Sequence, residues 1–249
     1  MLKKNKRLIV SLTIISVSMS ITPVASAMHI MEGYLLPQYC IAWGILCVPF
    51  LVVGFLSLKK RLKENRKNIT LMAMAGAFIF VISSLKIPSV TGSCSHMTGT
   101  GLGAILFGPV AVSILGIIVL LFQAILLAHG GITTLGANTF SMAIAGPLLT
   151  FILYKLGTKL KINRMVSIFI AACMGDLFTY SVTSVQLALA YPSVEGGVIP
   201  SVVKFLGVFA PTQLPLSILE GIITVLIIIA LETYAKPELK MLGFYKEVK

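Results

Sequence analysis

The chain has 249 residues, of which 57% are hydrophobic and only 11% are charged. Soluble globular domains average about 25% charged residues, so this composition excludes a soluble domain as well as a disordered chain. The 20 Lys and Arg residues outnumber the 8 Asp and Glu residues, which gives a net charge of +12. They cluster beside apolar segments, as the orientation charges of membrane proteins do, and not along a nucleic-acid-binding face. The sequence therefore predicts an all-α integral membrane protein.

Residues 1–27 have the three parts of a secretory signal peptide. A basic start is followed by an apolar stretch over residues 8–17 and by Ala25-Ser26-Ala27, which has the small-x-small pattern that signal peptidase requires. The apolar stretch is shorter than the roughly 20 residues that span a bilayer, so we favour cleavage after Ala27 over an uncleaved anchor. The mature membrane domain, residues 28–249, would then begin at Met28 outside the cytoplasm.

Seven apolar segments follow, and the basic clusters give their directions. The stretch 101–128 counts as two segments because Gly108-Pro109 interrupts it. Only this division brings the cluster at 155–164 to the same side as the cluster at 59–67. All basic clusters of the mature chain then become cytoplasmic, with the N-terminus outside and the C-terminus inside. The approximate ranges of the segments are 39–58, 69–87, 101–109, 110–128, 137–156, 165–190 and 203–234.

Two kinds of catalytic chemistry have no motif in this sequence. The chain contains neither a GxxxxGK[ST] phosphate-binding loop nor an HExxH zinc motif, so we expect neither an ATPase nor a metalloprotease. Asp176 and Glu220 are acids that lie within predicted segments, away from the ends. Such carboxylates are functional candidates, although a polar contact between helices would also explain them.

Three histidines, His29, His96 and His129, fall on the external side of this topology. After cleavage His29 is the second residue, so the Met28 amine, the His29 amide nitrogen and the His29 imidazole can bind one ion in five- and six-membered chelate rings. His96, in a loop of small polar residues, is the best fourth ligand, unless it simply faces water. Planar sets of nitrogen ligands suit Cu(II) and Ni(II), and low-spin Co(II) also accepts them.

Other residues are candidates for supporting roles. We expect Gln123, His129 or Asn138 to orient a ligating histidine, as groups behind metal ligands commonly do. Gln123 and Asn138 can equally satisfy unpaired backbone where helices break, and His129 as a direct ligand is a further alternative. Ala73 and Ala77 give their segment a small-xxx-small face, which suits a close helix contact within the chain or with a partner.

Residues 28–35, Met-His-Ile-Met-Glu-Gly-Tyr-Leu, closely resemble the mature start of the CbiM family, the cobalt-specific substrate-binding subunits of energy-coupling factor (ECF) transporters. The stretches 95–103, 128–138 and 211–216 are also similar to this family, so the resemblance covers nearly the whole mature chain. It implies a seven-segment helical bundle of the S-component type, with an extra N-terminal helix and an N-terminal loop that plugs the bundle from outside. It also implies that Met28, His29 and His96 hold the ion.

The resemblance further implies a transporter subunit and not an enzyme, in the plasma membrane of a prokaryote. A membrane coupling subunit, CbiQ, a separate cytoplasmic ATPase, CbiO, and the small membrane protein CbiN would act with it, and Ala73 and Ala77 would face the coupling subunit. The transported ion would be Co(II), and no other cofactor is expected. Ni(II) is the alternative, although nickel-specific relatives usually continue with Pro-Asp-Gly where this chain has residues 31–33, Met-Glu-Gly.

Overall fold

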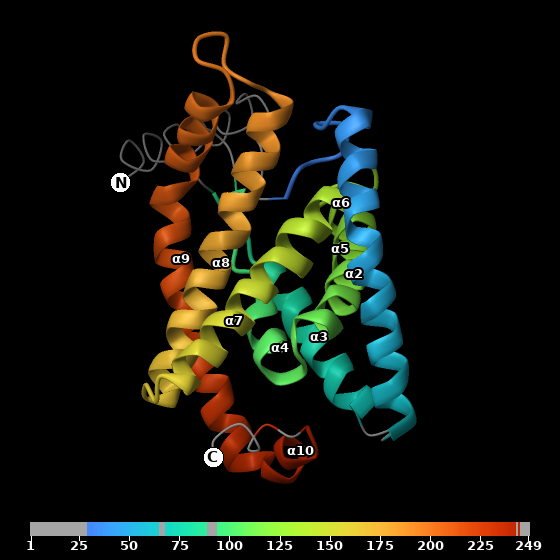
Figure 1. Ribbon diagram of the computed structural model, residues 1–249, viewed down its shortest axis with the longest axis vertical. Coiled ribbons are helices and arrows are strands. Elements are labelled where there is room, and N and C mark those ends of the chain that lie inside the picture. Colours follow the sequence, from blue (N-terminus) through green and yellow to red (C-terminus); the bar gives the residue numbers. More distant parts are fainter. Residues whose placement is uncertain (1–28, 65–67, 89–93, 243, 245–249) are drawn as a thin grey trace, which may run out of the picture.

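A computed structural model describes residues 29–64, 68–88, 94–242 and 244 of the chain. They form a helical bundle whose long members run between the two ends of the molecule (Figure 1). Two short strands, β1 (Ile87–Pro88) and β2 (Cys94–Ser95), pair antiparallel. The helices are α2 (Pro37–Glu64), α3 (Asn68–Ser84), α4 (Thr100–Phe107), α5 (Pro109–Leu127), α6 (Leu135–Asn138), the π-helix η2 (Thr139–Ala145), α7 (Gly146–Lys159), α8 (Arg164–Ala190), α9 (Val198–Tyr234) and α10 (Lys236–Met241).

The predicted all-α architecture is confirmed, and each predicted apolar segment coincides with a helical region. The segment expected at 137–156 is a continuous run of α6, η2 and α7 that includes a π-helical turn. The segment expected from residue 203 begins earlier, at Val198, and continues as one helix through Pro211 and Pro215. The short helix α10 was not predicted.

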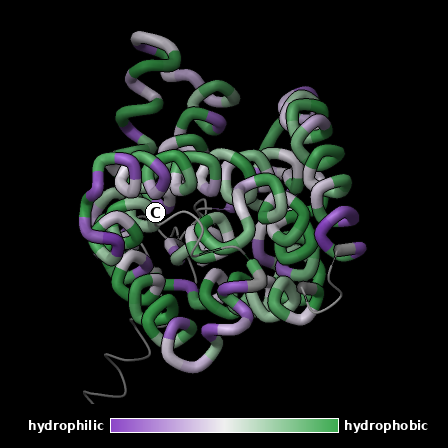
Figure 2. The backbone as a smooth tube through the Cα atoms, turned by 60° about the horizontal axis from the view of Figure 1, so that its bottom comes forward, coloured by the Kyte–Doolittle hydropathy of each residue, from purple (hydrophilic) through white to green (hydrophobic). Residues whose placement is uncertain are grey.

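Several of these helices have the length and composition of membrane spans. Five regions of the described chain qualify, at residues 37–63, 109–127, 135–159, 164–190 and 198–234. Helix α2 lies at one side of the bundle and leaves large apolar side chains such as Ile41, Ile45 and Phe55 more than half exposed. Figure 2 shows hydrophobic residues along most of the helices, with hydrophilic residues in short stretches between them. The chain is therefore a multi-pass membrane protein whose outer surface suits lipid.

Helix α4 is too short to cross a membrane, because eight residues extend only about 12 Å. All eight of its residues are buried. Gly108, with φ at 81°, ends this helix, and Pro109 begins α5. Glycine tolerates this backbone conformation, and proline is favoured in the first turn of a helix, so the break falls at the expected dipeptide.

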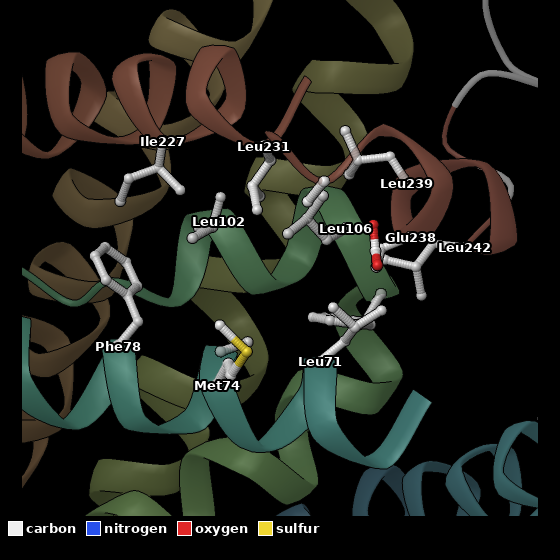
Figure 3. Close-up of a pocket in the computed structure, with 13 residues that line it drawn as sticks. Leu71, Met74, Phe78, Leu102, Leu106, Ile227, Leu231, Glu238, Leu239 and Leu242 are labelled. Atoms are coloured by element: carbon white, nitrogen blue, oxygen red, sulfur yellow. The ribbon is translucent and has the colours of Figure 1, made fainter. Parts of the chain in front are cut away.

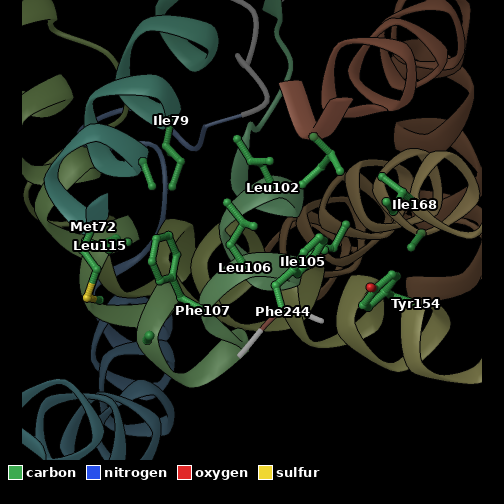
Figure 4. Close-up of a cluster of buried hydrophobic side chains, with 14 of the residues drawn as sticks. Met72, Ile79, Leu102, Ile105, Leu106, Phe107, Leu115, Tyr154, Ile168 and Phe244 are labelled. Carbon is green, nitrogen blue, oxygen red and sulfur yellow. The ribbon is translucent and has the colours of Figure 1, made fainter. Parts of the chain in front are cut away.

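Two apolar clusters hold the bundle together. In the larger cluster, side chains of α3, α4, α5, α7 and α8 meet, among them Ile79, Leu102, Leu115 and Tyr154 (Figure 4). The second cluster contains Ile30 together with Leu35, Ala137, Tyr180, Leu187, Ala190 and Phe209. The segment that begins at His29 is therefore packed into the interior and does not lie loosely on the surface.

The basic clusters of the described chain gather at one end of the bundle, which we call the basic end. Helix α2 ends there with Arg61 and Lys63, α7 ends there with Lys159, and α10 begins there at Lys236 (Figure 1). The segments that carry the three histidines lie toward the opposite end, which we call the histidine end.

Candidate metal centre

His29, His96 and His129 come from three separate segments and meet inside the bundle. Their ring centroids are 4.5 Å apart for His29 and His96, 4.4 Å for His29 and His129, and 4.9 Å for His96 and His129. One nitrogen from each ring lies within 4.8 Å of the others, and all three residues are buried. Within the described residues, this is the one group of three or more His, Cys, Asp or Glu side chains that could hold a metal ion.

His29 and His96 face each other directly. The distance from His29 Nδ1 to His96 Nε2 is 2.6 Å, and His96 Nδ1 lies 2.9 Å from the carbonyl oxygen of Met97. A carbonyl only accepts hydrogen bonds, so Nδ1 of His96 carries the hydrogen and Nε2 presents its lone pair toward His29. This is the orientation that a metal-binding histidine requires.

Burial keeps the three rings neutral. Desolvation, with smaller contributions from His129, His96 and Lys86, lowers the pKa of His29 well below 6.5. Desolvation also lowers the pKa of His96 to about 4 and that of His129 to about 2. Neutral imidazole is the form that binds metal, so near pH 7 a cation does not have to displace protons from these rings.

The backbone next to His29 is held by Asn138, the last residue of α6. The Asn138 side chain accepts a hydrogen bond from the Ile30 amide at 2.8 Å and donates one to the Ile30 carbonyl at 3.0 Å. Thr134 Oγ1 donates a second hydrogen bond to that carbonyl at 2.6 Å. Asn138 directly precedes the π-helix η2, and such π-helical turns often occur at functional sites.

The turn that follows α5 closes over the same N-terminal segment. A Cβ on Gly131 would lie 2.5 Å from Glu32 Cα, so glycine permits this approach. The Glu32 carboxylate accepts hydrogen bonds from Thr133 N at 3.1 Å and from Thr133 Oγ1 at 2.5 Å. These bonds, the side-chain bond above all, lower the pKa of Glu32.

Helix α9 holds the loop that carries His96. Gln213 Nε2 donates to the His96 carbonyl at 3.3 Å, and the Glu220 carboxylate accepts hydrogen bonds from Thr98 N at 2.6 Å, Thr98 Oγ1 at 2.8 Å and Gly99 N at 3.1 Å. Glu220 stands out in the sequence as an intramembrane acid, but nothing in the sequence indicates its partner or a role for Gln213.

The remaining candidates occupy different positions around the cluster. Met28 lies outside the described residues. Asn138 hydrogen-bonds to the Ile30 backbone and to Thr134 Oγ1. The Gln123 side chain donates to Ser83 Oγ at 2.7 Å, and it is the Gln123 backbone carbonyl that accepts the His129 amide at 3.1 Å. The His129 ring stands edge-on to both other rings, and neither of its nitrogens has a hydrogen-bond partner in the described chain.

Ala73 and Ala77 lie on the exposed face of α3 and are not part of the histidine cluster. They line a groove of about 470 Å³ between α3 and α5, together with Gly76, Ile118 and Phe122. A small-residue face is thus accessible to a second helix.

A separate cavity of about 270 Å³ lies between α3, α4, α9 and α10 (Figure 3). Its lining is apolar except for Glu238, with side chains such as Met74, Phe78, Leu106 and Leu231. Because it offers no nitrogen ligand, this cavity is not a second candidate for the metal centre.

Comparison with known proteins agrees with this architecture. The family model described as "Cobalt uptake substrate-specific transmembrane region", CbiM, matches residues 29–239. The "Cobalt transport protein CbiM" of Lachnoclostridium phytofermentans is 68% identical over 241 residues, which cover 97% of this chain and 96% of that protein. The protein of the same name from Ruminiclostridium cellulolyticum is 58% identical over 219 residues, which cover 88% of each chain.

Solved structures give the same result. A crystal structure described as a transition metal transporter matches with a TM-score of 0.75 and 30% identity, over 88% of this chain and 98% of that chain. A truncated transition metal transporter matches with a TM-score of 0.72 and 31% identity, over 83% of this chain and 99% of that one. Because the family model matches residues 29–239 and the relatives match most of the chain at high identity, the chain belongs to the CbiM family of cobalt-uptake membrane proteins.

Proposed function

We propose that this chain is the substrate-binding membrane subunit of an ATP-driven ECF importer and captures Co(II) outside the cell. The observation that carries the proposal is the separation of 2.6 Å between His29 Nδ1 and His96 Nε2. The relatives named cobalt transport proteins support Co(II) as the ion.

The ligand set follows from the place of His29 in the chain. Cleavage of residues 1–27 would make His29 the second residue of the mature protein. The Met28 amine, the His29 amide nitrogen and His29 Nδ1 then close five- and six-membered rings around one ion. Two nitrogens bound at about 2.0 Å and at a right angle to each other lie about 2.8 Å apart, which is close to the spacing between His29 and His96.

The surrounding residues would keep this chelate in place and dry. Asn138 fixes the Ile30 backbone, and the backbone carbonyl of Gln123 fixes the turn that carries His129. The His129 ring, edge-on to both proposed ligands, would exclude water from one side of the ion. In this arrangement His129 supports the site without being one of the four ligands.

Uptake would require partners, because the sequence contains no phosphate-binding loop of the GxxxxGK[ST] type. We propose CbiO as the ATPase, CbiQ as the membrane coupling subunit and CbiN as an assisting subunit. The exposed pair Ala73 and Ala77 on α3 suits close contact with a helix of the coupling subunit. The basic end would face the cytoplasm, and the histidine end would face outward.

Nickel uptake is the second candidate function. It is favoured by the donor set itself, because four nitrogens in a plane suit Ni(II) as well as they suit low-spin Co(II). The two functions share one site and one mechanism, so they differ only in the ion.

Binding of Co(II) to the purified mature protein tests the proposal. We expect His96→Ala to weaken binding by more than the 10- to 100-fold typical of a lost supporting group, and His129→Ala to weaken it by about that amount. If His96→Ala bound Co(II) with wild-type affinity, the four-nitrogen site would be refuted.

A further inference from the structure

Two carboxyl groups lie in the middle of the bundle, on the helices that contact the His96 loop. Asp176 of α8 and Glu220 of α9 are only 1% and 2% exposed. Their side chains form a hydrogen bond with each other. An ionised carboxylate has no hydrogen to donate, so at least one of the two residues carries a proton.

The surrounding donors identify which residue is protonated. Glu220 accepts hydrogen bonds from Thr98 N, Thr98 Oγ1 and Gly99 N, which is the environment of an ionised carboxylate. Asp176 Oδ2 accepts a hydrogen bond from Gln213 Nε2, whereas the buried Asp176 Oδ1 accepts none from the described residues. This pattern favours Asp176 as the acid that donates to Glu220, which would leave one negative charge on the pair.

Among the described residues, no basic side chain is paired with these carboxyl groups. The other residues that hydrogen-bond to the pair are Gln213 of α9 and, in the loop before α4, Thr98 and Gly99. All three are neutral. The ion pair found within the described residues joins Arg164 to Glu232, near the basic end. An anion buried in a membrane protein is costly without a positive charge to balance it.

The pair is connected to the histidine cluster through two contacts. Gln213 Nε2 donates to Asp176 and to the carbonyl of His96, and Glu220 holds the residues two and three positions after His96. Gln213 and Glu220 are seven residues apart on one helix, or about 10 Å along its axis, so the two contacts reach the His96 loop from successive turns of α9.

We propose that Asp176 and Glu220 share one proton and that the resulting single negative charge is the buried counter-charge for the divalent cation at the histidine cluster. This inference rests on the proposed function. A divalent ion bound to a deprotonated His29 amide carries a net charge of plus one, which the pair balances. A buried pair is screened little by salt, so this attraction acts at physiological ionic strength.

Infrared spectroscopy of the full mature protein at neutral pH tests the shared proton. Asp176→Asn has nearly the same shape and can still donate to Glu220, but it removes the carboxylic acid. We expect the wild type to show the carbonyl stretch of a protonated carboxyl group, with and without bound Co(II), and Asp176→Asn to lack it. The shared proton would be refuted if Asp176→Asn showed the same carbonyl band as the wild type. It would also be refuted if Co(II) abolished the band in the wild type.

Titration with Co(II) tests the counter-charge. Asp176→Asn leaves Glu220 ionised, so we expect its affinity to stay within about 3-fold of the wild type. The double variant Asp176→Asn/Glu220→Gln is neutral, and we expect at least about 10-fold weaker binding. Thr98→Val is the matched control, because it removes one hydrogen bond to Glu220 without changing any charge, and it should bind like Asp176→Asn.

Each other outcome has a distinct meaning. Wild-type affinity in the double variant would overturn the counter-charge. If Thr98→Val bound Co(II) as weakly as the double variant, the effect would come from anchoring of the loop, and the counter-charge would be overturned as well. If Asp176→Asn bound Co(II) as weakly as the double variant, both acids would be ionised in the resting protein, and the shared proton would be overturned. If the wild type itself failed to bind Co(II), the proposed function would fail instead.

Discussion

The carboxamide of Asn138 pairs with both polar backbone groups of Ile30. It accepts from the amide at 2.8 Å and donates to the carbonyl at 3.0 Å, while the Ile30 side chain is completely buried. His29 directly precedes Ile30, so this pairing fixes the backbone from which the His29 ring extends toward His96. The N-terminal segment is thus held at its backbone as well as by the packing of Ile30.

This relationship predicts a loss of metal affinity in Asn138→Ala. Each buried polar group left without a partner costs about 1–3 kcal/mol, and about 1.4 kcal/mol corresponds to a tenfold change, so we expect binding of Co(II) to weaken by roughly 10- to 100-fold. Isothermal titration calorimetry measures it. Asn163→Ala is the control, because Asn163 caps α8 near the basic end and should affect stability alone. Equal affinities in the two variants would contradict the role of Asn138.

The close approach of Gly131 to Glu32 gives a second prediction. A methyl group on Gly131 would meet Glu32 Cα and Oε2 at 2.5 Å, so Gly131→Ala should displace the N-terminal segment and reduce Co(II) binding at least about tenfold. A methyl group on Gly207 of α9 meets nothing within 4 Å. Gly207→Ala should therefore bind Co(II) normally. Normal binding by Gly131→Ala would show that the segment is not held as described.

Burial of the histidines predicts how stability of the metal-free protein depends on pH. The pKa of His96 is lowered to about 4 and that of His129 to about 2, and the pKa of His29 also lies well below 6.5. Below pH 6.5 the unfolded chain takes up protons at these rings and the folded protein does not. The free energy of unfolding should then fall by about 1.4 kcal/mol per pH unit for each histidine.

The contribution of His96 should stop changing below about pH 4, where the folded protein also becomes protonated at this ring. Thermal unfolding in detergent between pH 7 and 5 measures the effect, and the variant His96→Ala/His129→Ala should show a shallower decline. The same slope in both proteins would contradict neutral, buried rings.

Much of the fold could be predicted because the relevant signals are local. Apolar runs, basic clusters and the Gly108-Pro109 break are contiguous in sequence, and the structure follows them. The site depends instead on distant pairs, such as Thr98 with Glu220, which are 122 residues apart. No local pattern reports which partner a buried acid will find, so the roles of Gln213 and Glu220 and the π-helix after Asn138 could not be derived from the sequence.

Substitutions on the exposed face of α3 should slow transport without changing the binding of Co(II). Ala73→Leu/Ala77→Leu places bulky side chains on the outer surface without filling the core. We expect unchanged binding of Co(II) by the isolated chain, but loss of co-purification with the coupling subunit and at least about tenfold slower uptake by cells. Leu substitution at Ile118, across the same groove, conserves apolar volume and serves as the control. Normal uptake by the double variant would exclude this face as the coupling surface.

The central claim is a metal site completed by a free N-terminus at Met28. Native mass spectrometry of the purified protein after exposure to equal concentrations of cobalt and nickel tests it most directly. The account predicts a chain of residues 28–249 with one tightly held cobalt ion; nickel in its place would leave the site intact and identify the second candidate function. A chain that retained residues 1–27 and still bound the metal tightly would contradict the claim, because the Met28 amine could not then be a ligand.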